Sequence, residues 1–439
     1  METIAMAARL SFRALASAAA LAMTALALPA VTHSVHAAPA APAVRDVMTT
    51  YANIAEAVFS DAASRAKDLN SAIDALLAAP DQKSLDAARA AWKAARVPYA
   101  QSEGFRFGNK IVDDWEGNVN SWPLDEGLID YVDTASYGDA KNENPLYTAN
   151  IIARKTLRLG PKVIDASKID KALLLKLNRA LDVEANVGTG YHAIEFLLWG
   201  QDLNGTGPGA GNRPASDFDL KACTGGNCDR RRAYLKAAAG LLASDAAKMA
   251  ANWKASGPAR KALNAQPDSA KLASILTGIG SLSYGELAGE RMKLGVLLHD
   301  TEEEQDCFSD NTHNSHYFDQ VGMMAIWNGR YEGSKKVEGA SVAALVREKS
   351  PEAAKRVDDA MAVTLAKLKA IKDKADSGEM AYDQMLAAGN DAGNKMILDG
   401  VDALVAQARA IEAAVAALSL KVTIEGSDSL DQPDAVGKK

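Results

Sequence analysis

The chain has 439 residues, 48% of them hydrophobic, so it is long enough for two domains with sizeable cores. Its 56 acidic and 49 basic residues give a formal net charge of −7 at pH 7, and no segment forms a basic stripe, which argues against a nucleic-acid partner. Apolar residues recur with helical spacing instead of alternating, which predicts an all-α fold.

The first 37 residues have the pattern of a secretory signal peptide. Arg9 and Arg13 precede an apolar run at 14–30, and a small-residue cleavage pattern, Val-His-Ala, ends at Ala37. No later run is long and apolar enough to span a bilayer, so we expect no transmembrane segment in the mature chain. We therefore expect the mature protein in a bacterial periplasm. Association with the outer membrane is the alternative location.

Helical spacing starts after an Ala/Pro linker at 38–44. The first predicted helix starts at Val47 and ends near Pro80, and the second runs from about Ser84 until Pro98 kinks or stops it. Further helices are predicted at about 150–159, 168–184, 191–199, 229–254, 270–299, 317–327, 342–346, 351–374 and 391–418.

Two stretches rich in Asn, Asp and Gly interrupt the helices, at 109–148 and 200–227. The first contains Trp-Pro-Leu-Asp at 122–125. Long loops of this kind are usually functional, although the aromatic residues can also serve only to pin the loop to a helical bundle.

A weak internal echo predicts a duplicated bundle, because the helix near Trp92 and the helix near Gly285 each lead into an acidic residue and an aromatic loop. We therefore expect two helical-bundle domains with long structured loops. The predicted boundaries are a signal peptide at 1–37, an N-terminal bundle at 45–187, a C-terminal bundle at 188–420 and a disordered tail at 421–439.

Three cysteines leave one unpaired. Cys223 and Cys228 flank a Thr-Gly-Gly-Asn turn, which predicts a local disulfide in an oxidising compartment. Cys307 would then be free, either buried or weakly linked to a metal.

The run at 190–199 is apolar except for His192 and Glu195, which lie three residues apart and so share one face of a helix. Buried without partners, an imidazole and a carboxylate would cost several kcal/mol, so they are predicted to bind each other or a metal. The plain alternative is a structural His–Glu hydrogen bond in a core.

A metal site needs further ligands. The His-Glu-x-x-His pattern of zinc peptidases is absent because residue 196 is Phe. Glu103, at a helix end, and Asp125, in the Trp-Pro loop, are the candidates. Imidazole and carboxylate ligands suit iron or zinc.

A second candidate region is the acidic and histidine-rich stretch at 299–316. Its candidate ligands are Glu304, Asp310 and His313. The alternatives are that Asp310 and its neighbours cap a helix and that the glutamates form a solvated face.

Residues 190–195 (Gly-Tyr-His-Ala-Ile-Glu) resemble the G-x-H-x-x-E motif of the imelysin family of secreted bacterial proteins. Residues 96–105 and 122–125 support this resemblance, and 307–313 resemble the family's iron-regulated protein A branch. The resemblance covers nearly all of 45–420. It implies two all-helical bundles with the His/Glu motif near their interface, and it carries over His192 and Glu195 as metal ligands.

The resulting hypothesis is a periplasmic imelysin-like metal-binding protein linked to iron uptake or iron homeostasis. Its cofactor would be a divalent or trivalent metal ion, with iron favoured over zinc. A periplasmic or outer-membrane iron-transport protein would be its partner. One alternative is an extracytoplasmic metallopeptidase, a label that the family carries although no general base stands out beside the motif. The other is a non-catalytic scaffold or adhesion protein.

Overall fold

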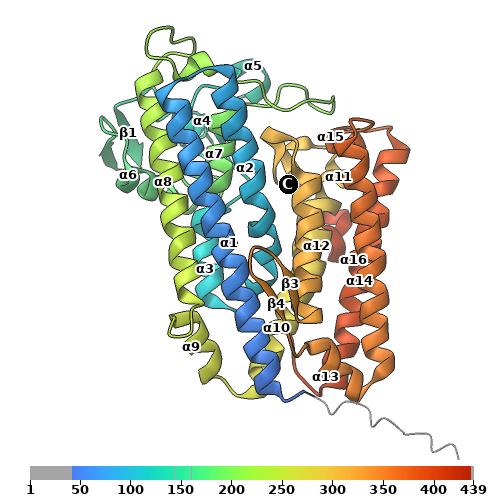
Figure 1. The fold of residues 1–439 in the computed structure, drawn as a ribbon. Coiled ribbons are helices and arrows are strands. Elements are labelled where there is room, and N and C mark those ends of the chain that lie inside the picture. Colours follow the sequence, from blue (N-terminus) through green and yellow to red (C-terminus); the bar gives the residue numbers. More distant parts are fainter. Residues whose placement is uncertain (1–41, 143, 160, 437–439) are drawn as a thin grey trace, which may run out of the picture. The chain divides into compact units, whose positions relative to one another are not determined.

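The computed structural model describes residues 42–142, 144–159 and 161–436, and helices dominate it (Figure 1). The all-α expectation is confirmed. Within the described ranges the strands are two small antiparallel pairs, β1 (Thr156–Leu159) with β2 (Lys162–Asp165) and β3 (Arg330–Glu332) with β4 (Lys336–Glu338). The predicted signal peptide lies outside the described residues. No helix among the described residues is long and apolar enough to cross a membrane.

The first group of helices is built on α1 (Val44–Ala78), α2 (Gln82–Ser102) and α8 (Cys228–Asn252), which lie side by side (Figure 1). Asp81 and Ser84 form a capping box that starts α2. Pro98 lies inside α2, so the expectation of a stop there is wrong. Burial of Ala95 and Tyr99 on both sides of the proline outweighs the one backbone hydrogen bond that it removes.

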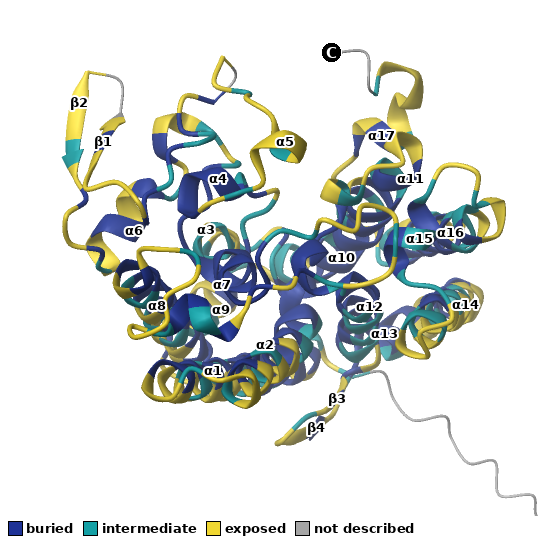
Figure 2. Cartoon of the chain, turned by 90° about the horizontal axis from the view of Figure 1, so that it is seen from above, coloured by how far each residue is buried: buried dark blue, intermediate teal, exposed yellow. Residues whose placement is uncertain are grey.

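Helix α7 (Gly190–Trp199) packs against both α2 and α8, and all ten of its residues are buried. Figure 2 shows it in dark blue between α8 and α2, on their inner side. Gly190 has a φ of +86°, and a Cβ at this position would lie 2.4 Å from the Val119 carbonyl oxygen. The sequence therefore needs glycine where α7 begins.

The second group contains the helices that follow α8. A π-helix, η4 (Leu282–Lys293), directly continues α10 (Asp268–Ser281) and leads into α11 (Leu294–Leu298). It packs against α16 (Asp391–Ala417), which also packs against α14 (Pro351–Asp376). The other helices of this group are α9 (Pro258–Ala265), α12 (Thr312–Asn328), α13 (Val342–Lys349) and α15 (Tyr382–Leu386).

Buried apolar residues form two clusters, and α1 contributes to both. Core A takes the first part of α1, from Val47 to Phe59, together with α10, η4, α12, α14 and α16. Core B takes the second part of α1, from Ala66 to Leu77, together with α2, α7 and α8. Buried residues on both sides of the predicted boundary at 187/188 belong to core B, and the two-domain division itself stays a prediction.

The segment between α2 and α7 differs from expectation. The helix predicted at 150–159 is wrong, because Thr156 and Leu157 pair with Asp165 and Ile164 in the β1–β2 ladder. A Gly-Pro pair in the sequence directly after residue 159 disfavours helix continuation. The short elements here are η1 (Glu103–Phe105), α3 (Lys110–Val119), α4 (Glu126–Ile129), α5 (Thr134–Tyr137), α6 (Lys171–Leu177) and η2 (Ala180–Asp182).

The segment after α16 is packed where the structure describes it, whereas the sequence predicts a disordered tail. Ser429 Oγ donates to the Gly289 carbonyl, and Tyr284 donates to Asp431. These contacts hold α17 (Asp428–Asp431) on η4, and η7 (Pro433–Ala435) follows. The remaining short helices are η3 (Ala215–Phe218), η5 (Thr301–Glu303) and η6 (Cys307–Ser309).

Candidate metal centre

The structure brings His192 and Glu195 of α7 together with Asp306, which immediately precedes η6. One ligand atom from each of these three side chains lies within 4.8 Å of the others. His192 Nδ1 is 2.9 Å from Glu195 Oε2 and 4.0 Å from Asp306 Oδ1. The three side chains are fully buried. We call His192, Glu195 and Asp306 the triad. It offers one imidazole nitrogen and two carboxylate groups in a fully buried environment.

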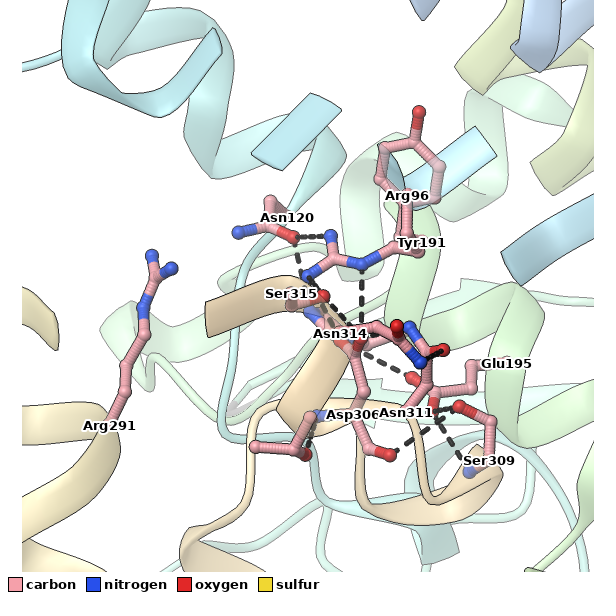
Figure 3. A network of polar contacts seen from close by, with 12 residues as sticks. Arg96, Asn120, Tyr191, Glu195, Arg291, Asp306, Ser309, Asn311, Asn314 and Ser315 are labelled. Atoms are coloured by element: carbon pink, nitrogen blue, oxygen red, sulfur yellow. Dashed lines mark hydrogen bonds and ion pairs between the residues drawn. The ribbon is translucent and has the colours of Figure 1, made fainter. Parts of the chain in front are cut away.

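Ser309 fixes the Glu195 carboxyl group. Its backbone N–H and its hydroxyl both donate to Glu195 Oε1, at 3.0 and 2.6 Å (Figure 3). Oε1 is thereby occupied, and Oε2 is left facing His192. The η6 turn thus orients one oxygen of Glu195 toward the centre of the triad.

Asp306 is held in the same way. Ser315 Oγ and Asn311 Nδ2 donate to its Oδ2, at 2.6 and 2.9 Å. Arg96 Nη2 lies 2.9 Å from Oδ1 as an ion pair, but Oδ1 accepts no aligned hydrogen bond among the described residues. Oδ1 is the oxygen nearest His192, so it keeps lone-pair capacity toward the triad.

Asn120 determines which nitrogen of His192 carries the proton. Its Oδ1 accepts from Arg96 Nη1 at 2.5 Å, which orients the amide, and the same oxygen lies 3.2 Å from His192 Nε2. Nε2 must therefore carry the hydrogen and donate it. In a neutral ring Nδ1 then has a free lone pair, and the Glu195 carboxyl group donates its own proton to it.

The pKa shifts agree with this assignment. Burial, and then the nearby Arg96 charge, lower the pKa of His192 to about 3. Burial, and then the Asp306 charge, raise the pKa of Glu195 well above its usual range. Burial would also raise the pKa of Asp306, but Arg96 and His192 outweigh it and bring the pKa to about 2. These directions favour a neutral imidazole, a protonated Glu195 and an ionised Asp306.

Glu103 and Asp125 lie outside the triad. Glu103 pairs with Arg291 Nη2 at 2.5 Å and receives a 3.4 Å contact from Asn120 Nδ2, so it touches the triad only through Asn120. Asp125 accepts from Asn144 Nδ2 at 2.5 Å.

The second candidate set is dispersed. His313 Nε2 is 2.9 Å from Asp376 Oδ1, whereas Asp310 belongs to a separate carboxylate group described below. Glu304 is completely buried.

Sequence reasoning missed Asp306, Arg96, Asn120 and Ser309. Asp306 is one of six acidic residues in 299–316, and the linear sequence holds no signal that separates it from the other five. His316 is also noteworthy, because both of its ring nitrogens are buried without a hydrogen-bond partner among the described residues. Burial, and then Arg291, lower its pKa to about 3.

Two pockets end next to the triad. One of about 730 Å³ is lined by Asn120, Arg291 and Gln305. Another of about 250 Å³ is lined by Arg96, Asn311 and Ser315.

Cys223 and Cys228 are joined by a disulfide with a Cα–Cα distance of 5.9 Å, and Cys307 is a free, buried thiol. Burial raises the pKa of the Cys307 thiol well above its usual range, which favours the protonated thiol.

These features define an all-helical protein with a buried centre of one histidine and two carboxylates. The family model described as Imelysin matches residues 55–411, so the chain belongs to the imelysin family, as its G-x-H-x-x-E motif predicts.

Two relatives carry iron-related names. The chain is 37% identical over 67 residues to iron-regulated protein A of Synechococcus elongatus, an alignment that covers 15% of this chain and 19% of that protein. The chain therefore spans about a fifth of that relative's length. A solved structure described as a candidate iron-regulated protein A precursor from Parabacteroides distasonis superposes with a TM-score of 0.59. It is 17% identical and covers 86% of this chain and 96% of its own, which shows a shared fold.

Proposed function

We propose that this protein is an extracytoplasmic metal-binding protein linked to iron uptake or iron homeostasis, and that His192, Glu195 and Asp306 bind the ion. The observation that carries this proposal is the triad of converging donor atoms within 4.8 Å, one of which, Asp306 Oδ1, accepts no aligned hydrogen bond among the described residues. The iron-related names of the two relatives support iron over zinc.

The two separations measured from His192 suit a first-row metal. Ligand atoms bound at about 2.1 Å lie up to about 4.2 Å apart, and His192 Nδ1 is 2.9 and 4.0 Å from the two carboxylate oxygens. One imidazole and two carboxylates match the preferences of iron and zinc. Asn120 acts on the outer side of His192, where its acceptor keeps the hydrogen on Nε2 and leaves Nδ1 for the metal.

The peptidase alternative lacks a comparable supporting observation. A metal-dependent peptidase needs an open coordination position and contact between the ion and the substrate. His192 and Glu195 are at most 1% exposed, so a peptide bond does not reach their donor atoms in this arrangement. A binding role requires access only for an ion, for which the two adjoining pockets provide room.

The periplasmic location and an iron-transport partner are parts of the same proposal. The Cys223–Cys228 disulfide supports an oxidising compartment.

A titration of the chelator-treated mature protein with Fe²⁺ under anaerobic conditions, and separately with Zn²⁺, tests the proposal. His192→Ala should weaken binding by about 100-fold or more, since it removes the one nitrogen ligand. His313→Ala is the matched control, because its imidazole pairs with Asp376 outside the triad, and it should bind like the parent. If His192→Ala binds both metals like the parent but melts at a lower temperature, the pair is structural and the proposal fails.

A further inference from the structure

A second group of carboxylates lies outside the triad. Asp202 follows α7, Asp310 follows η6, and Asp383 lies in α15. One oxygen from each lies within 4.8 Å of the others. Three segments that are far apart in sequence thus bring three acidic side chains to one point.

Glu304 places a fully buried carboxyl group beside Asp383, one member of this group. It is 0% exposed, and neither of its oxygens has a hydrogen-bond partner among the described residues. Its carboxyl group faces that of Asp383, while Thr312 lies close by without an aligned hydrogen bond. Asp383 is 1% exposed, and both of its oxygens also lack a partner in the described part of the chain.

No basic side chain of the described ranges lies within 4.0 Å of these four carboxyl groups, although Lys93 is near enough to act on Asp310 electrostatically. Asp202 accepts from Asn204, and Asp310 Oδ2 accepts from the Gly209 N–H, so part of each group is engaged. Asp310 Oδ1 is buried without a hydrogen-bond partner in the described ranges. Buried carboxylates that lack donors require either protons or a cation.

We propose that Asp202, Asp310, Asp383 and Glu304 form a second metal site that binds a hard divalent cation, namely calcium. All of the donors are carboxylate oxygens, which hard cations prefer, whereas the triad contains an imidazole. Calcium takes six to eight oxygen ligands in a flexible geometry, whereas magnesium demands a near-ideal octahedron and usually keeps several waters, so carboxyl groups gathered from separate segments favour calcium. Water would complete the coordination.

A pocket provides a route for the ion. It has a volume of about 660 Å³, and Asp202 lies in its lining. The same lining contains Asp125, Asp133 and Glu302, so the route is acidic and attracts cations.

The site would join parts of both core clusters. Asp383 belongs to α15, whose Met385 and Leu386 are buried in core A. Asp202 follows α7, which lies in core B. A bound ion would therefore tie α15 to the chain segments around α7 and η6.

The experiment uses the chelator-treated mature protein, with thermal unfolding and calorimetric titration in CaCl₂ and in MgCl₂. Calcium should bind with a stoichiometry of one and raise the melting temperature, and magnesium should do so less. Asp383→Asn should weaken calcium binding about tenfold or more, because affinity follows the number of charged ligands. In the absence of metal the same variant should melt at the parent's temperature or higher, since it removes a carboxylate that repels its neighbours.

Two control variants show whether the calcium response belongs to these four carboxyl groups. Asp359→Asn removes an exposed carboxylate of α14 that pairs with Lys355, and it should keep the full calcium response. His192→Ala should also keep it, so loss of the triad's metal would not affect the result. If Asp383→Asn does not fold, the half-buried Asp202→Asn takes its place. The proposal is overturned if the parent takes up no calcium at about 1 mM, or if Asp383→Asn or its replacement binds calcium as tightly as the parent.

Discussion

At the scale of single residues, the chemistry of the triad depends on where one proton lies. Asn120 holds a hydrogen on His192 Nε2, so the proton between Nδ1 and Glu195 Oε2 belongs to Glu195. Burial raises the pKa of Glu195 and lowers that of His192, and both shifts favour the neutral form of the group. A metal ion must therefore displace the proton of Glu195 and not one from the ring.

This proton makes metal affinity dependent on pH. Below the raised pKa of Glu195 the binding constant should rise about tenfold per pH unit, because each ion bound releases one proton. Calorimetric titration in buffers of different ionisation enthalpy measures that proton directly. An affinity that stays constant between about pH 5.5 and 7.5, with no proton released, would contradict the assignment.

Replacing Glu195 by glutamine separates folding from binding. The Gln side chain still accepts from Ser309 and still donates to His192 Nδ1, so it mimics the protonated acid. We expect Glu195→Gln to unfold in urea within about 1 kcal/mol of the parent and to lose metal binding. If Glu195 were instead ionised beside a protonated Nδ1, the same change would place two donors face to face. The variant would then lose about 1–3 kcal/mol.

At the scale of elements, α7 can present His192 and Glu195 only because its first residue is Gly190. Its φ of +86° and its contact with the Val119 backbone exclude a side chain at that position. The η6 turn is the matching element on the other side of the triad, because it places Ser309 against Glu195.

A pair of glycine variants tests this role of Gly190. Gly190→Ala should lower the free energy of unfolding by about 3 kcal/mol or more, since strain at a positive φ and a backbone clash add together. Gly205→Ala is matched in the sign of φ, at +56°, but has nothing within 4 Å, so it should cost only about 1 kcal/mol. Chemical denaturation of both variants gives the difference. Equal losses would show that the approach of Val119 does not constrain α7.

At the scale of the whole molecule, the arrangement depends on the two apolar cores that share α1. Core B surrounds α7 and takes in Phe308 of η6, while α12, which follows η6, packs in core A. The triad therefore combines a helix of core B with a turn that leads into core A.

The disulfide belongs to the same scale, because it closes only a short loop on the edge of core B. Reduction, or the double change Cys223→Ala and Cys228→Ala, should cost about 2 kcal/mol at most and leave the helical circular dichroism unchanged. Non-reducing peptide mapping of protein from a periplasmic fraction should show Cys223 linked to Cys228 and a mature N-terminus near Ala38. Free thiols at both cysteines on a chain that retains Met1 would contradict the extracytoplasmic location.

The sequence alone determined the helical class and the pairing of His192 with Glu195, because both depend on local spacing. Apolar residues at helical intervals form one face, and two side chains three residues apart meet on that face whatever lies around them. Local spacing gave a wrong helix prediction at 150–159, because residues 156–159 pair with residues 162–165 in the β1–β2 hairpin.

Tertiary structure alone decided the third member of the triad and the partners that control its protons. Asp306 lies 111 residues beyond Glu195 in the sequence (306 − 195). Only the docking of η6 on α7 distinguishes Asp306 from its acidic neighbours. Glu103 and Asp125 were plausible ligands by composition, yet Arg291 and Asn144 bind them elsewhere. Such contacts depend on how two cores pack, and that packing is a property of the whole chain rather than of any short stretch.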